Sequence, residues 1–151
     1  MSFDIREKIQ KQIQTALKER NNQRVSVLRL LLSSIKNKEI QSKKALTDDE
    51  LISVVSSQIK QRKESIEGYT KGGRTDLANQ EESEINILQE FLPPQIDDAE
   101  LMGLIDSAIK ETNAESPKDM GKLMARLMPD VKGRADGKHV NQLVKQRLSQ
   151  Q

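Results

Sequence analysis

The sequence of 151 residues has no cysteine, no tryptophan, one tyrosine and two phenylalanines. Without cysteine the chain has no disulfide, no thiolate metal site and no cysteine nucleophile, and a reducing compartment is permitted. Because aromatic residues are so few, the core must consist of leucine, isoleucine, valine and methionine, which suits helix-on-helix packing better than a sandwich or barrel. The same scarcity removes the stacking platforms that bind single-stranded nucleic acids.

Long apolar runs are absent as well. No run approaches the roughly 18 residues that a membrane span requires. The first residues, MSFDIREKIQKQ, lack the apolar core of a secretion signal. We therefore expect a cytoplasmic protein with no membrane partner.

Residues for catalysis are few. His139 is the only histidine, which excludes histidine-based triads and multi-histidine metal sites, and a lone histidine is usually a surface residue. Neither glycine-rich nucleotide-binding motif, G-x-G-x-x-G or G-x-x-x-x-G-K-[ST], is present. The acidic clusters at 48–50, 81–82 and 97–98 lie at helix starts or on a helix face, where carboxylates are expected. The sequence predicts no catalytic residue, no metal site and no cofactor.

Apolar residues recur at intervals of three and four along the chain, which predicts helices, and no alternating strand pattern occurs. The first four helices are expected at residues 2–20, 23–43, 47–72 and 75–91, and three shorter ones at 97–148. The predicted fold class is all-α, with an N-terminal helical domain over residues 1–92 and a three-helix C-terminal domain over residues 96–151. The boundary is placed at Pro93-Pro94, because proline cannot continue a helix.

Local signals support these helices. Thr47 and Glu50 form a capping-box pattern, and Asp97 and Asp136 are placed to cap later helices. On the first helix Phe3, Ile5, Ile9, Ile13 and Leu17 are expected to face the core. On the second, Leu30 and Ile40 widen the apolar stripe, which predicts contacts with two neighbouring helices.

The net charge of +2 conceals an uneven distribution. Residues 1–71 hold 15 Lys/Arg and 9 Asp/Glu, residues 72–116 hold 2 and 11, and residues 117–151 hold 8 and 3. One interpretation is that an acidic helix packs between basic neighbours. The other is that two basic surfaces are available to a polyanion.

Residues 120–148 combine two short amphipathic helices with a basic, glycine-containing turn. The turn is KGRADGKH at residues 132–139, where Gly133 and Gly137 allow backbone angles that other residues avoid. Four cations lie on or beside it: Arg126, Lys132, Arg134 and Lys138. Because each neutralised phosphate releases counterions, a few such contacts would give salt-sensitive binding. Since stacking residues are lacking, a folded RNA fits this surface better than a single strand.

Three stretches resemble the YqeY family. They are RVSVLRLLLSSIKNKEI, QIKQRKESIEGYTKGGRTDLANQEESEINILQEFLPPQ and MGKLMARLMPDVKGRADGKHVNQLVKQRL. The third, with its M-G-K-x-M start and K-G-R-A-D-G-K-x-V turn, is also similar to the tail domain of the GatB subunit of tRNA-dependent amidotransferase. The resemblance implies an all-helical protein whose C-terminal module engages the outer body of a tRNA. The family name further implies glutamine-dependent carbon-nitrogen ligase activity.

Together these observations give a leading hypothesis, an accessory protein that binds tRNA or another structured RNA. Lys132, Arg134 and Lys138 would contact phosphates, Arg126 and Lys122 would extend the patch, and the two glycines would let the turn approach the RNA backbone. The free amides that open the last helix would accept a phosphate. A second basic surface would continue the footprint, although several of its members are placed to pair with the acidic fourth helix: Arg24, Arg29, Lys36, Arg62 and Arg74.

Two alternatives belong to other classes. The chain would be a protein-interaction module if an acidic helix or the methionine stripe docked an amidotransferase or synthetase subunit. That stripe, Met120, Met124 and Met128, is adaptable, although methionine at this spacing is usually core. The third alternative is a contribution to carbon-nitrogen ligase activity.

Overall fold

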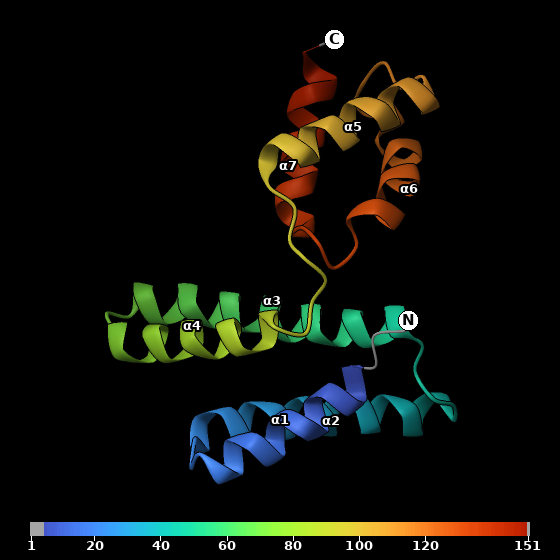
Figure 1. Cartoon of the computed structure of the whole chain (residues 1–151). Helices are drawn as coiled ribbons and strands as arrows, with labels where there is room; N and C mark the ends of the chain where they lie inside the picture. The colour runs from blue at the N-terminus through green and yellow to red at the C-terminus, as the bar shows by residue number, and fades with distance from the viewer. Residues whose placement is uncertain (1–4, 151) are drawn as a thin grey trace. The chain divides into compact units, whose positions relative to one another are not determined.

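The computed structural model describes residues 5–150 of the chain. Within this range it contains seven α-helices, one short 3-10 helix and no strand (Figure 1). The prediction of an all-α fold is confirmed. Residues 2–4, including Phe3, belonged to the predicted first helix but lie outside the described residues. The elements are α1 Ile5–Lys18, α2 Asn22–Ser42, α3 Asp48–Lys71, α4 Thr75–Gln89, α5 Asp98–Thr112, η1 Pro117–Asp119, α6 Met120–Val131 and α7 Gly137–Ser149.

Short polar residues fix the helix starts. The side chains of Thr47, Asp97 and Asp136 accept hydrogen bonds from first-turn amides of α3, α5 and α7, as their positions predicted. The start expected at Ser116 opens with the 3-10 turn η1 before α6 begins. There the Asp119 carboxylate accepts from the amides of Glu115 and Ser116.

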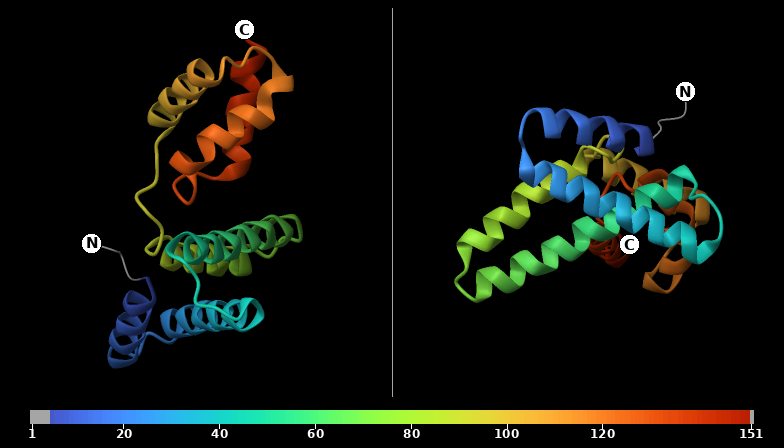
Figure 2. Two further views of the ribbon diagram at one scale, coloured as in Figure 1. Left: turned by 90° about the vertical axis from the view of Figure 1, so that its right-hand side faces the viewer. Right: turned by 90° about the horizontal axis from the view of Figure 1, so that it is seen from below.

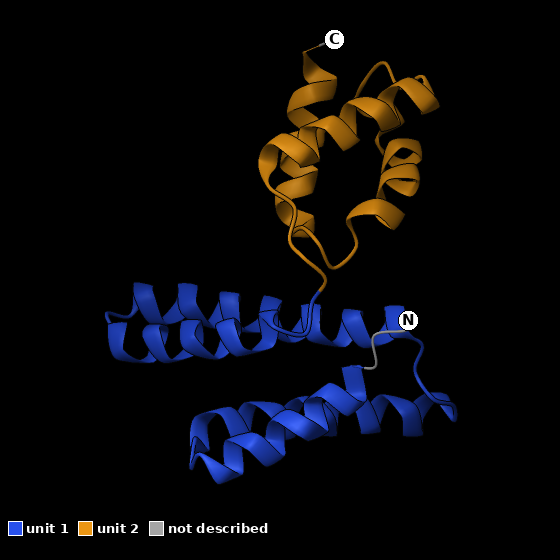
Figure 3. Ribbon diagram, in the orientation of Figure 1, with its two compact units in different colours: residues 1–92 blue, residues 93–151 orange. Residues whose placement is uncertain are grey.

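The chain forms two compact units, unit 1 at residues 1–92 and unit 2 at residues 93–151 (Figure 3). Each unit has its own cluster of buried aliphatic side chains, so each holds a separate hydrophobic core. The units are therefore described one at a time.

Unit 1 has two layers, with the α1–α2 pair on one side and the α3–α4 pair on the other (Figures 1 and 2). Helix α2 is central, since it packs against α1, α3 and α4. Phe91 and Leu88 lie fully buried between the layers. The Lys8 ammonium lies 5.1 Å from the Phe91 ring centroid and donates to the Glu90 carbonyl at 2.5 Å, which fixes α1 to the end of α4.

Three apolar side chains of unit 1 do not lie where the sequence predicted. Leu17 is exposed instead of facing the core. Leu30 is 53% exposed and Ile40 is 74% exposed, so they do not widen the buried stripe of α2 as predicted, although α2 itself does contact neighbouring helices. The physical reason is that Val25, Val27, Leu28, Leu31 and Ile35 already provide a wide buried face, and this face makes the contacts of α2 with its neighbours.

Unit 2 packs α5, α6 and α7 around a second core. Its central residues, Leu101, Ile105, Leu123, Leu127 and Leu148, are almost completely buried. Met120 and Met124 are half-buried against this core, whereas Met128 is exposed. The methionine stripe is thus mostly core, with its last member at the surface.

Candidate nucleic-acid interface

The segment before α5 lies against the basic turn and holds it in place. The Ile96 amide donates to the Arg134 carbonyl at 2.9 Å, and the Gln95 side-chain amide donates to the Gly133 carbonyl at 2.9 Å. The Ile96 side chain packs on the core of unit 2. The turn is therefore a supported part of unit 2 rather than a free loop.

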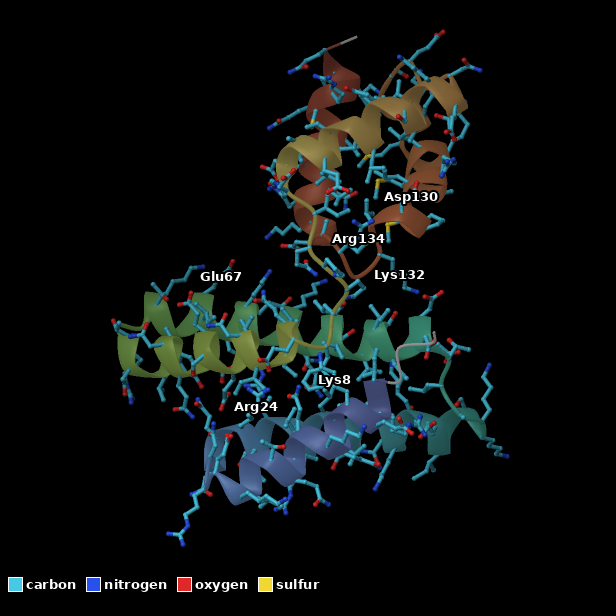
Figure 4. The ribbon with its side chains drawn as sticks, viewed as in Figure 1. Lys8, Arg24, Glu67, Asp130, Lys132 and Arg134 are labelled. Carbon is cyan, nitrogen blue, oxygen red and sulfur yellow. The ribbon has the colours of Figure 1, made fainter. Side chains whose placement is uncertain are left out.

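The side chain of Arg134 also fixes the basic turn to its neighbours (Figure 4). Its Nε donates to the Pro94 carbonyl and its Nη1 to the Asp130 carbonyl, both at 3.3 Å. Its Nη2 lies 3.6 Å from a carboxylate oxygen of Glu100. Because the guanidinium is already occupied by these groups, Arg134 is best explained as a residue that positions the turn. Its predicted contact with phosphate stays a prediction.

The two glycines of the turn differ. Gly133 has a φ of +73°, the left-handed conformation that side chains disfavour, so the sequence-based explanation for this glycine is confirmed. Gly137 is the first residue of α7 and does not have a positive φ. The same explanation for Gly137 is therefore wrong. A Cβ at Gly137 would meet no atom within 4 Å, which leaves the surface beside it open.

The amides at the start of α7 are not all free. Asp136 caps this helix by accepting from the Lys138 amide at 3.2 Å. Its carboxylate occupies the place where an anion would otherwise bind a helix N-terminus. A phosphate therefore cannot simply take that amide, and binding at the turn must depend on side chains.

The lysines of the predicted patch are differently placed from its arginines. Lys122, Lys132 and Lys138 are exposed, and no carboxylate of the described residues lies within ion-pair distance of them. They come from the first turn of α6, the end of α6 and the first turn of α7. Arg126 instead pairs with Glu111 and, at 3.2 Å, with Asp130. The hydrogen bond to Glu111 raises the pKa of Arg126 above its ordinary value.

The second predicted basic surface, in unit 1, likewise contains both paired and unpaired cations. Arg24 pairs with Glu90, Arg62 with Glu81 and Glu84, and Arg74 with Asp76. Arg29 and Lys36 remain exposed on α2, with no ion pair among the described residues. Figure 4 shows Arg24 beside the end of α4, as its pairing requires. The structure therefore joins Arg24 and Arg62 to acidic α4 rather than to one basic footprint.

Two contacts of unit 2 were missed by sequence reasoning. Arg147 makes a two-armed pair with Asp106, each arm 2.7 Å long, and His139 Nε2 lies 2.8 Å from a carboxylate oxygen of Asp98. Arg147 holds the pKa of Asp106 below its ordinary value through this hydrogen bond. Each pair joins residues 41 positions apart, so no local motif signals it. The available signal was the acidic block of α5 opposite the basic block of α6 and α7.

Other kinds of site find little support. No group of three or more His, Cys, Asp or Glu side chains at residues 5–150 is arranged to hold a metal ion. Across the same range, no helix has the length and apolar character needed to cross a bilayer. What the described surface offers chemically is exposed ammonium groups on a supported helical frame.

Comparison with known proteins gives the family. The model of the family described as Yqey-like protein matches residues 6–148, nearly the whole chain. The chain belongs to the YqeY family. The resemblance to this family that the sequence suggested is thereby confirmed, and residues 120–148 lie within the matched region.

Several fungal relatives are called "Altered inheritance of mitochondria protein 41, mitochondrial". That of Pyrenophora tritici-repentis is 28% identical over 142 residues, which cover 92% of this chain and 78% of the relative. That of Lachancea thermotolerans is 36% identical over 112 residues, covering 72% and 60%. That of Kluyveromyces lactis is 33% identical over 129 residues, covering 80% and 70%.

These names contradict the expectation of a cytoplasmic protein, because the relatives that carry them are named as mitochondrial. The expectation depended on the lack of cysteine and of long apolar runs. Those features fit any reducing aqueous compartment, so they could not separate the cytoplasm from the interior of an organelle.

Proposed function

We propose that this YqeY-family protein binds structured RNA, with tRNA as the first candidate, through Lys122, Lys132 and Lys138 of unit 2. One observation carries the proposal. Lys132 and Lys138 are exposed at the basic turn and Lys122 on the first turn of α6, and none of the three makes an ion pair, whereas the arginines beside them are engaged by the protein itself. The resemblance of residues 120–148 to the GatB tail supports RNA as the polyanion.

Arginine and lysine have separate roles in this proposal. The planar guanidinium of Arg134 suits several fixed acceptors at once, and here it joins the turn to the segment before α5. The lysine ammonium is a compact charge on a flexible stem, and it suits phosphates whose positions vary along a folded RNA. Arg134 would therefore act indirectly, by holding Lys132 at the surface.

The charge of unit 2 limits the strength of binding. Residues 93–151 hold nine Lys/Arg and nine Asp/Glu, so the unit as a whole gives no long-range attraction. With about three phosphate contacts, we expect micromolar binding that weakens steadily as salt is raised. The module would read shape and backbone rather than base sequence, because it lacks aromatic stacking residues.

The test is a titration of a tRNA pool with the full-length protein at increasing salt. A triple variant with Lys122, Lys132 and Lys138 changed to alanine should bind at least about tenfold more weakly and show a smaller salt dependence. The matched control changes three other exposed lysines of unit 2, Lys110, Lys118 and Lys145, to alanine. It removes the same charge from the same unit and should retain most of the binding.

Two results would contradict the proposal. One is binding that does not respond to salt, because a phosphate interface must respond. The other is an equal loss in both triple variants, since that would indicate attraction by total charge rather than a defined site. Circular dichroism of each variant distinguishes lost binding from lost folding, and exposed lysines should be removable without unfolding.

A second candidate is docking of a protein partner, such as an amidotransferase or synthetase subunit, on α6. It is favoured by an exposed, uncharged strip on this helix, formed by Gly121, Ala125, Met128 and Pro129. Small residues four apart beside a flexible methionine would let another helix approach closely. Capture from nuclease-treated lysate would test it. One stoichiometric protein lost with Met128→Asp, together with unchanged tRNA binding, would favour this candidate.

A further inference from the structure

The two layers of unit 1 carry excess charge of opposite sign. Residues 5–44, which form the α1–α2 layer, hold 11 Lys/Arg and 3 Asp/Glu. Residues 45–92, which form the α3–α4 layer, hold 5 Lys/Arg and 10 Asp/Glu. Some of these charges pair across the layers, as Arg24 of α2 does with Glu90 next to α4. Most of the cations of the α1–α2 layer make no such pair.

The cations of the α1–α2 layer that make no ion pair are numerous and exposed. Within the described residues, Arg6 pairs with Glu39, Arg24 pairs with Glu90, and Lys8 donates to a carbonyl. The remaining cations of the layer are exposed and make no ion pair: Lys11, Lys18, Arg20, Arg29, Lys36, Lys38, Lys43 and Lys44. Such a concentration of unpaired positive charge would attract an anionic surface.

Aliphatic side chains lie among these cations. Four large hydrophobic residues of the described chain are exposed, and Leu17, Leu30 and Ile40 all belong to the α1–α2 layer. On α2 the residues Arg29, Lys36 and Ile40 follow one another at intervals of seven and four, so they lie along one line of the helix. Leu30 lies about 100° around the helix from Arg29, and all four are exposed on the side away from the buried stripe. Helix α2 already packs against three helices, and this face is left over.

We propose that the outer face of the α1–α2 layer docks on membranes that carry anionic phospholipids. The cations would lie among the lipid phosphates while Leu30 and Ile40 insert between headgroups, as in proteins that rest on a bilayer without crossing it. The expectation of no membrane partner depended on the lack of a spanning helix, which remains true of the described residues. A surface contact does not need one.

The arrangement favours a bilayer over two other anionic partners. A folded RNA would be held by the cations alone and would leave Leu30 and Ile40 in water. A partner helix needs a continuous apolar ridge, whereas these two side chains are ten positions apart, about 15 Å along the helix, with Ser33 and Asn37 on the face between them. In a bilayer each apolar side chain inserts independently, so separate ones suffice. The cations also extend across both helices, which is wider than a single partner helix.

The first experiment measures sedimentation of the full-length protein with vesicles. We expect binding to mixed phosphatidylcholine and phosphatidylglycerol vesicles, weakened by salt, and little binding to phosphatidylcholine alone. The double variant Leu30→Ser/Ile40→Ser should bind roughly tenfold more weakly, and Arg29→Gln/Lys36→Gln should lose a similar factor. The matched controls are Met128→Ser, the fourth exposed aliphatic residue, and Lys60→Gln/Lys71→Gln on α3. Both controls should bind like the parent protein.

The second experiment uses the absence of tryptophan from the chain. The variant Ile40→Trp carries a single tryptophan, which lies on the proposed face, and its emission should shift to the blue when anionic vesicles are added. The variant Lys60→Trp, on the other layer, should not shift. A blue shift confined to Ile40→Trp reports entry into the apolar part of the bilayer, which charge attraction alone does not produce.

Several outcomes would overturn the proposal. Equal binding to neutral vesicles, full binding by Leu30→Ser/Ile40→Ser, or no shift from Ile40→Trp each would do so. If that serine variant abolishes self-association of the free protein instead, the face is a contact between chains. If the Arg29→Gln/Lys36→Gln variant loses tRNA binding but not vesicle binding, the face belongs to RNA. The alanine variant of Lys122, Lys132 and Lys138 should leave vesicle binding intact, so failure of the RNA proposal is recognised separately.

Discussion

In unit 2 all three arginines are held by the protein's own carboxylates, whereas in unit 1 Arg20 and Arg29 remain outside such pairs. The carboxylates of unit 2 come mostly from α5, which pairs with both helices that follow it. In unit 1, by contrast, α4 pairs with inner cations and the outer α1–α2 layer keeps its excess positive charge. The arginines of unit 2 are thus structural, whereas the lysines of its basic block, like most cations of the α1–α2 layer, are exposed and make no ion pair among the described residues.

This difference shows how a run of cations in a sequence should be interpreted. The arginines of a basic block are the first candidates for internal pairs, because the guanidinium satisfies several acceptors in fixed geometry. The lysines remain to interact with solvent or ligands. In this protein the rule selects Lys132 and Lys138 from the basic turn and assigns Arg134 to its support.

The largest expected effect tests whether the two units unfold separately. Leu127 is completely buried in the core of unit 2, and Leu127→Ala should cost about 2–5 kcal/mol of unfolding free energy through lost burial and a residual cavity. Hydrogen exchange read peptide by peptide should show faster exchange across α5, α6 and α7. Peptides from α1 to α4 should be unchanged.

The matched variant is Leu31→Ala, which empties an equally buried site in unit 1. It should give the reverse pattern, with faster exchange in α1 to α4 only. If both variants loosen the whole chain equally, the two cores form one cooperative unit, and the comparison between them loses its basis.

The helices were predictable because their signals are local. The helices α3, α5 and α7 begin directly after the caps Thr47, Asp97 and Asp136, and α4 ends at Gln89, shortly before Pro93-Pro94. Burial was less predictable at the margins of a stripe. Leu30 and Ile40 were expected to widen the buried stripe of α2 because they are apolar, but which side of α2 its neighbours cover is set by tertiary packing, which helical periodicity does not contain.

The candidate site was only half predictable, for a related reason. The exposure of Lys132 and Lys138 follows from their type and from a polar turn. The pairing of Arg134 with Glu100 and of Arg126 with Glu111 depends on how α5 crosses the later helices. Charge counts along the sequence revealed the two opposite blocks but not which members of each would meet.

The next prediction compares two arginines that differ in burial. The Arg62 side chain is 14% exposed between Glu81 and Glu84, and Arg62→Ala should cost about 1–3 kcal/mol because it leaves two half-buried carboxylates without a partner. Arg74 is 59% exposed in its pair with Asp76, and Arg74→Ala should cost much less than Arg62→Ala, because water screens an exposed pair. Urea unfolding followed by circular dichroism would compare them. Equal costs would show that burial does not decide the value of these pairs.

A smaller effect separates the two glycines of the basic turn. Gly133→Ala should cost about 1 kcal/mol, because the φ of +73° at this position disfavours a Cβ. Gly137→Ala should be neutral or stabilise by up to about 1 kcal/mol, because the position is helical and open. Thermal unfolding gives both values. If Gly137→Ala folds normally but binds tRNA more weakly, the RNA backbone approaches α7 at this point.

The smallest predicted effect is a pH dependence within unit 2. Arg147 lowers the pKa of Asp106 from its ordinary value of 3.8, so the ionised carboxylate favours the folded state. This stabilisation is complete above the ordinary value and is lost as the pH falls through the lower pKa of the folded protein. The parent protein should therefore have a higher melting temperature than Asp106→Asn at about pH 7, and this difference should shrink at about pH 3.

Arg147→Gln should behave like Asp106→Asn, because either change removes the pair. The control Glu115→Gln removes a carboxylate with no ion pair in the described structure. It should melt like the parent protein at both pH values. The effect ranks last because both partners are partly exposed, and water screens such pairs. A constant difference between the parent and Asp106→Asn across this range would mean that the pair does not stabilise unit 2 through its charge, and that α5 and α7 are joined by their buried faces alone.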